Sequence, residues 1–322
     1  MEIDIQYLLF LQNLRVMTGG IFDEVFNAIS KFAVDYMIMI PYIVYWAVDK
    51  SWGYRYMFTT WILECVNGIV KLTVCAYRPW IRSPLIEPAG DSKVAATGYS
   101  FPSGHTLMAT NIYGNTIVYQ KDKRKRLAII CGIMIALTGF SRNFLGVHTP
   151  QDVIVGFLEA LVAIVIIGKV SDYLKGKEEL IDKLTYLGIV LSVACTAYSI
   201  FKNYPMDYVN GALLVDPVVM QKDMFCGCGG FLALLMGSYI ELHFIHYEIN
   251  FNSKNLPVLT AVGVLLMMAW RSLFYPAILV RAFGIRWGNY LGSFVLIFFA
   301  VVIWPMVIKK FDKGNKTEKM IR

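Results

Sequence analysis

Three short stretches of the sequence carry basic, histidine and carboxylate side chains at spacings that could bind and attack a phosphate group. They read "KLTVCAYRP" (71–79), "PSGH" (102–105) and "SRNFLGVHTPQD" (141–152). The first and third supply three cations, Lys71, Arg78 and Arg142. Converging cations in a partly dry site suit a group with about two negative charges, and phosphate is the obvious candidate.

The second stretch is typical of a helix N-terminus that binds an anion. Ser103 is a favoured N-cap residue, and Gly104 lets the backbone approach a ligand closely. The free amides of a first helical turn attract negative charge. His105 stands in that turn, where it could give a proton to a departing oxygen.

The third stretch predicts another helix start with a histidine just before it. Thr149 fits the N-cap, Pro150 the first helical position and Asp152 the third. A carboxylate four residues after His148 could bind one imidazole nitrogen and leave the other as a nucleophile. Taken alone, Lys71 could be a snorkelling residue and Asp152 a plain helix cap. Their joint occurrence favours a catalytic site.

The elements that must position these residues are membrane helices. The chain has 322 residues, of which 57% are apolar and 16% charged. About 20 apolar residues span a bilayer as a helix. The predicted spans are 32–48, 54–77, 104–120, 127–143, 151–170, 184–201, 223–243, 257–279 and 289–308. The third span is rich in Thr and Asn, which predicts a central position in the bundle.

Charge predicts the orientation. The net charge of +7 includes the basic run "KDKRKR" (121–126). If that loop is cytoplasmic, most Lys and Arg residues outside the spans fall on the same side. We therefore expect the N-terminus outside, the C-terminus inside, and all three stretches on the non-cytoplasmic face of a plasma (inner) membrane. The basic run then indicates topology and no nucleic-acid partner.

Several other features have simpler interpretations. The segment 1–31 begins with acids rather than a basic signal region, so we expect an interfacial segment. Cys226 and Cys228 suggest small-residue helix packing rather than a redox pair. Arg271 and Glu241, both near membrane depth, are predicted to pair and to tie the last helices together.

The three stretches resemble the type 2 phosphatidic acid phosphatase superfamily, membrane phosphatases related to vanadium haloperoxidases. Its signature is Lys, six residues, Arg-Pro; then Pro-Ser-Gly-His; then Ser-Arg, five residues, His, three residues, Asp. All three parts are complete here, and the resemblance covers roughly 30–200. It implies His148 as nucleophile, Asp152 as its orienting partner and His105 as general acid. The residues implied to hold the phosphoryl group are Lys71, Arg78, Ser103, Gly104 and Arg142.

We therefore expect an all-α, polytopic membrane helical bundle with about nine transmembrane helices and a phosphatase core related to vanadium haloperoxidases. The predicted divisions are the segment 1–31, a six-helix core at 32–201, and three further helices with a basic tail at 202–322. The expected substrate is a lipid phosphate in the membrane, with no metal and no cofactor. The alternatives are a hydrolase of a soluble sugar phosphate similar to glucose-6-phosphatase, and a multi-span anion transporter.

Overall fold

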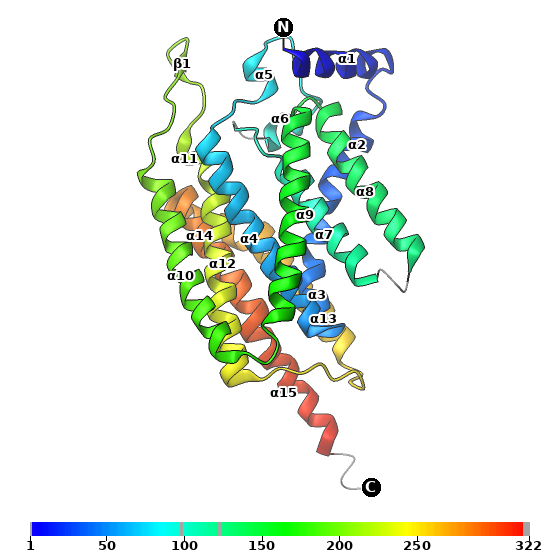
Figure 1. Ribbon diagram of the computed structural model, residues 1–322, viewed down its shortest axis with the longest axis vertical. Coiled ribbons are helices and arrows are strands. Elements are labelled where there is room, and N and C mark those ends of the chain that lie inside the picture. The colour runs from blue at the N-terminus through cyan, green and yellow to red at the C-terminus, as the bar shows by residue number, and fades with distance from the viewer. Residues whose placement is uncertain (1, 97–98, 121–123, 318–322) are drawn as a thin grey trace. The chain divides into compact units, whose positions relative to one another are not determined.

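The chain is almost entirely helical (Figure 1). The computed structural model describes residues 2–96, 99–120 and 124–317. Within these ranges the strands form one hairpin, in which β1 (Tyr208–Val209) pairs antiparallel with β2 (Ala212–Leu213). The first three residues of the basic run 121–126 lie outside the described residues.

The α-helices of the first part of the chain are α1 (Ile3–Met17), α2 (Asp23–Lys31), α3 (Ile40–Ala47), α4 (Lys50–Val74), α5 (Pro79–Arg82), α6 (Ser92–Ala95), α7 (Gly104–Gln120), α8 (Lys125–Phe144), α9 (Pro150–Tyr173) and α10 (Glu178–Phe201). Those that follow are α11 (Pro217–Met220), α12 (Lys222–Ile240), α13 (Leu256–Ala269), α14 (Arg281–Phe298) and α15 (Trp304–Thr317). Short segments of tighter or wider helix are η1 (Phe32–Tyr36), η2 (Met37–Met39), η3 (Glu241–Ile245), η4 (Trp270–Phe274), η5 (Pro276–Val280) and η6 (Phe299–Ile303).

Seven helical stretches of the described chain are long and apolar enough to cross a membrane: Asp23–Ala47, Lys50–Val74, Lys125–Phe144, Pro150–Tyr173, Glu178–Phe201, Pro217–Ile245 and Leu256–Phe311. The predicted helical membrane fold is confirmed, whereas the predicted count of nine is not. Two differences explain the change. The predicted span 104–120 is a helix of 17 residues with a polar composition, and the last two predicted spans form one helical stretch of 56 residues.

That last stretch turns back on itself at Gly284. Its backbone angles, φ 75° and ψ 175°, are not helical, and they lie where a glycine meets no steric penalty. After the turn, a Cβ atom on Gly288 would lie 2.4 Å from Val280 Cα, and one on Gly292 would lie 2.5 Å from the Tyr275 ring. The two arms therefore pack closely through glycines.

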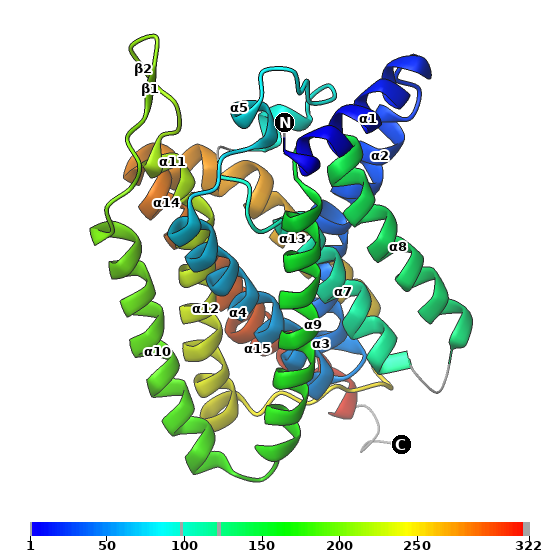
Figure 2. The same cartoon turned by 45° about the horizontal axis from the view of Figure 1, so that its top comes forward.

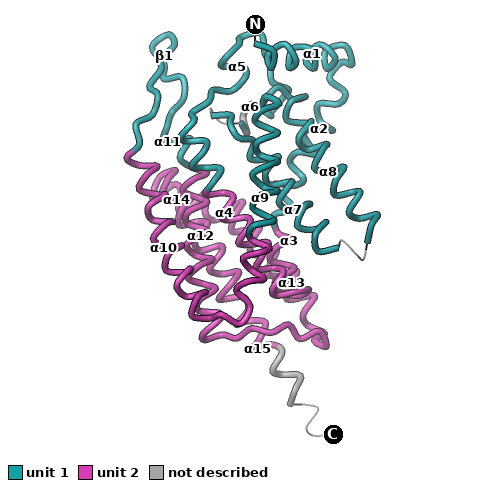
Figure 3. Tube along the Cα trace, in the orientation of Figure 1, with its two compact units in different colours: residues 1–38, 66–166, 202–221 teal, residues 39–65, 167–201, 222–322 magenta. Residues whose placement is uncertain are grey.

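The chain divides into two compact units (Figure 3). Unit 1 comprises residues 1–38, 66–166 and 202–221, and unit 2 comprises 39–65, 167–201 and 222–322. Every predicted site residue belongs to unit 1. Because the units alternate along the sequence, they do not follow the predicted boundary at 201, and that division stays a prediction.

In unit 1, α7 has the buried polar face that its composition predicts. Thr110 and Asn111 are fully buried, and the Asn115 amide donates to the Asn111 side chain at 2.9 Å. Helix α7 packs against α8 and η1. Helix α1 lies across the end of α8 (Figures 1 and 2), so unit 1 closes one end of its helices with a transverse helix.

In unit 2, α12 packs through small residues, as the "FCGCGG" stretch predicts. A Cβ atom on Gly229 would lie 2.2 Å from the Tyr290 carbonyl oxygen, and one on Gly230 would lie 2.1 Å from the Trp61 ring. The Cys226 carbonyl accepts a hydrogen bond from Ser293 Oγ at 2.7 Å. All six cysteines are free thiols, so this stretch packs helices together.

The predicted pair of Glu241 and Arg271 is wrong. Glu241 is 2% exposed, and its carboxylate accepts from Lys50 Nζ at 2.6 Å, Tyr54 Oη at 3.0 Å and the Tyr247 backbone amide at 2.7 Å. Lys50, which is distant in sequence, neutralises the Glu241 carboxylate. Helix packing, rather than the sequence pattern, brings Lys50 to this carboxylate. The Glu241–Lys50 pair therefore joins η3 to the start of α4 and does not tie the later helices to one another.

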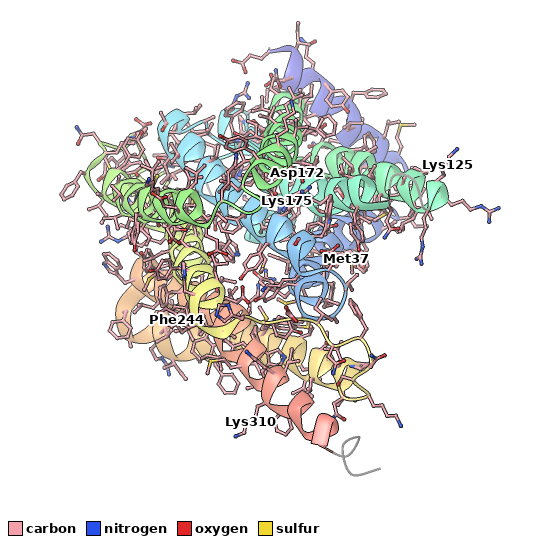
Figure 4. The ribbon with its side chains drawn as sticks, turned by 60° about the horizontal axis from the view of Figure 1, so that its bottom comes forward. Met37, Lys125, Asp172, Lys175, Phe244 and Lys310 are labelled. Atoms are coloured by element: carbon pink, nitrogen blue, oxygen red, sulfur yellow. The ribbon has the colours of Figure 1, made fainter. Side chains whose placement is uncertain are left out.

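Ion pairs also mark the end of α9 in unit 2. Lys175 Nζ lies 2.8 Å from Asp172 Oδ1, and the two side chains lie next to each other on that helix end (Figure 4). Arg55 binds the same carboxylate. In unit 1, Lys125 extends outward from the first turn of α8 (Figure 4). These exposed charges fit helix ends that meet water.

Candidate active site

The N-terminus of α9 is built by the capping arrangement that its sequence predicts. Helix α9 begins at Pro150. Asp152 Oδ2 accepts from the Thr149 backbone amide at 2.8 Å, and Thr149 Oγ1 lies 3.4 Å from the Asp152 amide. Ser100 Oγ donates to the same Asp152 oxygen at 2.6 Å. These hydrogen bonds hold the Asp152 carboxylate in a fixed position beside the His148 imidazole.

His148 is held between a carboxylate and a guanidinium. Its Nδ1 lies 3.3 Å from Asp152 Oδ2, and its Nε2 lies 2.7 Å from Arg78 Nη1. A guanidinium only donates hydrogen bonds, so Nε2 accepts and Nδ1 carries the proton that Asp152 binds. The arrangement selects the neutral tautomer whose Nε2 lone pair faces the cations.

The environment also keeps His148 neutral. Its side chain is 2% exposed. Burial lowers the pKa of His148 to about 3, and the positive charge of Arg78 acts in the same direction, against the opposing effect of Asp152. A neutral imidazole is the nucleophilic form.

Arg78 comes from a loop rather than from the helix that carries Lys71. Helix α4 ends at Val74, and Cys75 adopts φ 51°. Although seven residues separate Lys71 and Arg78, the two cations therefore do not lie on one helix face. Instead Arg78 Nη1 donates to the Val147 carbonyl at 2.9 Å, which places the guanidinium beside the third motif.

The second motif is joined directly to the third. Helix α7 begins at Gly104, and Ser103 Oγ accepts from the Thr106 hydroxyl at 3.0 Å. The Ser103 amide donates to the Asp152 carbonyl at 2.9 Å. This approach requires Gly156, where a Cβ atom would lie 2.6 Å from the Ser103 carbonyl oxygen.

His105 stands in the first turn of α7 and is half-buried. The cations that act electrostatically on its imidazole are Arg142, Arg78 and Lys71. His105 of the second motif thus interacts electrostatically with residues of the first and third motifs. A Cβ atom on Gly104 would lie 4.0 Å from Lys71 Nζ. The Lys71 ammonium therefore also lies at the start of α7.

Arg142 is buried, with 2% of its surface exposed. Its Nη1 donates to Ser30 Oγ at 2.8 Å. Its Nε has no hydrogen-bond partner among the described residues. A buried guanidinium with an unused donor is costly, so an anionic ligand would stabilise it.

Two contacts of this site were not predicted from the sequence. Ser100 holds Asp152 from 52 positions away, and Ser30 holds Arg142 from 112 positions away. A single serine carries no spacing or periodicity that marks it. Ser100 directly precedes the second motif, which is a weak positional signal, whereas nothing in the sequence around Ser30 indicates its role.

The comparison with known protein families supports the motif analysis. The PAP2 superfamily matches residues 52–176. This segment is similar to the PAP2 superfamily. It contains all eight predicted site residues, which confirms the predicted family over a shorter range than the expected 30–200. Helix α2, which supplies Ser30, precedes the matched segment.

One curated relative is the "Phosphatidylglycerophosphatase B" of Bacillus subtilis (strain 168). It is 30% identical over 111 residues, which are 32% of this chain and 54% of the relative. The similarity thus spans about half the length of that protein. No solved structure is significantly similar to the chain.

Proposed function

We propose that this PAP2 superfamily protein is an integral membrane phosphatase that removes phosphate from a lipid phosphate or pyrophosphate through a phosphohistidine intermediate. The observation that carries the proposal is the setting of His148. Its Nδ1 meets Asp152 at 3.3 Å and its Nε2 meets Arg78 at 2.7 Å. A neutral imidazole aimed into a group of cations is what attack on a bound phosphate requires.

In the first step, His148 Nε2 attacks phosphorus and the bond from phosphorus to the substrate oxygen breaks. His105 gives a proton to that departing oxygen. The positive imidazolium that forms on His148 is stabilised by Asp152 through the Nδ1 proton. Lys71, Arg78 and Arg142 offset the charge on the phosphoryl oxygens, which is usually the largest rate contribution in phosphoryl transfer.

In the second step, water attacks the phosphohistidine. His105, now without its proton, accepts one from the water, and the bond between phosphorus and Nε2 breaks. Ser103 and Gly104 lie at the N-terminus of α7, where backbone amides can bind the phosphoryl oxygens throughout. The products are inorganic phosphate and the dephosphorylated lipid, and the residues return to their starting protonation states.

A lipid substrate is favoured over a soluble one by the similarity to a protein named phosphatidylglycerophosphatase B. The apolar helical stretches, which suit a multi-pass membrane protein, are compatible with a substrate that stays in the bilayer. We place the site on the non-cytoplasmic face of a plasma (inner) membrane, from the distribution of Lys and Arg in the sequence.

The test is phosphate release by the purified protein from phosphatidylglycerophosphate, phosphatidic acid, an isoprenyl pyrophosphate and glucose 6-phosphate. We expect turnover of a lipid phosphate, inhibition by vanadate and no loss of activity in a chelator. Turnover of glucose 6-phosphate alone would favour the sugar phosphatase. Phosphate transport into liposomes without hydrolysis would favour the transporter. Activity lost in a chelator and restored by magnesium would contradict the metal-independent mechanism.

A further inference from the structure

A second carboxylate follows Asp152 on the same face of α9. Asp152 and Glu159 are seven residues apart, which is about two helical turns, or roughly 10 Å along the axis. Gly156 lies between them, where the Ser103 backbone crosses the helix. The mechanism uses Asp152 but gives no role to Glu159. An ionisable residue in a membrane helix is costly unless it has a partner or a function.

Glu159 has a partner on α4. Asn67 Nδ2 donates to Glu159 Oε2 at 3.3 Å, and Asn67 is 6% exposed. Asn67 precedes Lys71 by four residues, so the two side chains are neighbours on one face of α4. The carboxylate of α9 is therefore linked to the face of α4 that presents the predicted phosphate-binding lysine.

Both side chains of that face meet the start of α7. A Cβ atom on Gly104 would lie 3.9 Å from Asn67 Oδ1 and 4.0 Å from Lys71 Nζ. The amide oxygen and the ammonium thus converge beside the first residue of the second motif. Lys71 and Glu159 also interact electrostatically, so the negative charge of the carboxylate acts at this ammonium.

We propose that Glu159 is a positioning residue that, through Asn67, holds the Lys71 ammonium at the phosphate site. The inference rests on the proposed function. It would give the site two carboxylates on one helix face, with Asp152 orienting the nucleophile and Glu159 orienting a phosphate ligand.

The physical need for such a residue follows from the neighbouring charges. A lysine side chain has a flexible four-carbon stem and three rotatable donors. Arg78 and Arg142 carry the same charge in the same unit, and like charges repel a third cation in a partly dry site. A carboxylate that interacts electrostatically with Lys71 offsets part of this repulsion.

The experiment measures KM, kcat and the vanadate concentration that half-inhibits the enzyme for wild type, E159A, K71A and the double variant. We expect E159A to raise KM and the vanadate constant about tenfold, the size of a lost hydrogen bond to a charged group, with a smaller change in kcat. In the K71A background, E159A should add nothing. E159Q keeps an acceptor for Asn67 and should recover part of the loss.

The alternative is that Glu159 only packs α4 against α9. In that case E159A would lower thermal stability but leave the vanadate constant unchanged, or its effect would add fully to that of K71A. Either result would overturn the inference. E241Q is the control, because it removes a carboxylate of unit 2 that binds Lys50. It should lower stability and leave the vanadate constant as in wild type.

Two further measurements separate the outcomes. If E159A does not fold, N67A removes the same link and should show the same pattern. Vanadate-dependent thermal stabilisation reports anion binding without turnover. A wild type that binds vanadate but hydrolyses none of the substrates would contradict the proposed function and still test the inference, whereas a wild type that does neither would overturn both.

Discussion

At the scale of single residues, the proposed chemistry depends on His148. We expect His148→Ala to reduce phosphate release to below about one hundredth of wild type, because histidine proton transfer alone contributes roughly 10²–10⁴ and a nucleophile contributes at least as much. The measurement is phosphate release per folded molecule. His243→Ala is the control, since His243 binds Asp182 in unit 2 at 2.9 Å. Activity above one hundredth in His148→Ala would exclude the nucleophile role.

The neutral state of His148 also makes a prediction about stability. Its pKa is about 3 in the folded protein and about 6.5 in an unfolded chain. Between these values the unfolded state binds more protons, so the free energy of unfolding falls as pH is lowered from about 6.5 to about 3. Above 6.5 the residue adds no pH dependence. Thermal melts should show a smaller slope in this window for His148→Gln than for wild type. Equal slopes would contradict the buried neutral imidazole.

At the scale of elements, the contact between α9 and the second motif requires a glycine. Gly156→Ala would place its Cβ atom 2.6 Å from the Ser103 carbonyl oxygen. We expect the collision to lower the free energy of unfolding by about 1–3 kcal/mol and to reduce turnover by moving the start of α7. Gly168→Ala on the same helix is the matched control, because its Cβ atom would meet no atom within 4 Å. It should keep stability and activity. Equal stability and activity of the two variants would contradict the requirement for glycine at position 156.

Helix α2 lies before the matched segment yet contacts the predicted phosphate site. Ser30→Ala removes the hydroxyl that accepts from Arg142 Nη1 at 2.8 Å. We expect KM for the substrate to rise about tenfold or more, as for one lost hydrogen bond to a charged group, with a small change in kcat. Ser238→Ala is the control, since Ser238 Oγ donates to a carbonyl of its own helix. An unchanged KM in Ser30→Ala would show that Arg142 needs no support from α2.

At the scale of the whole molecule, the orientation in the membrane is open to a direct test. Lys93 and Lys125 are both exposed, and the charge distribution predicts opposite sides for them. An impermeant thiol label should reach Lys93→Cys on intact cells and Lys125→Cys only after permeabilisation. The wild type, whose six cysteines are buried or half-buried, measures background labelling. The reverse pattern would turn the site toward the cytoplasm.

The sequence by itself determined the features that depend on neighbouring residues. Apolar length predicted the helices, because a helix satisfies its own backbone groups within the bilayer. Local spacing predicted the cap formed by Thr149 and Asp152, and the motif pattern predicted the family. The polar composition of 104–120 predicted a central helix, since buried polar groups need partners that lipid does not offer.

Only the tertiary structure decided which distant residues meet. Arg142 binds Ser30, Asp152 binds Ser100, and Glu241 binds Lys50 rather than Arg271. A buried polar group must find a partner of opposite charge or hydrogen-bonding type. The sequence therefore predicts that a partner exists for each of these residues. Which partner satisfies it depends on how the helices pack, and helix packing brings together residues whose separation along the chain follows no local period.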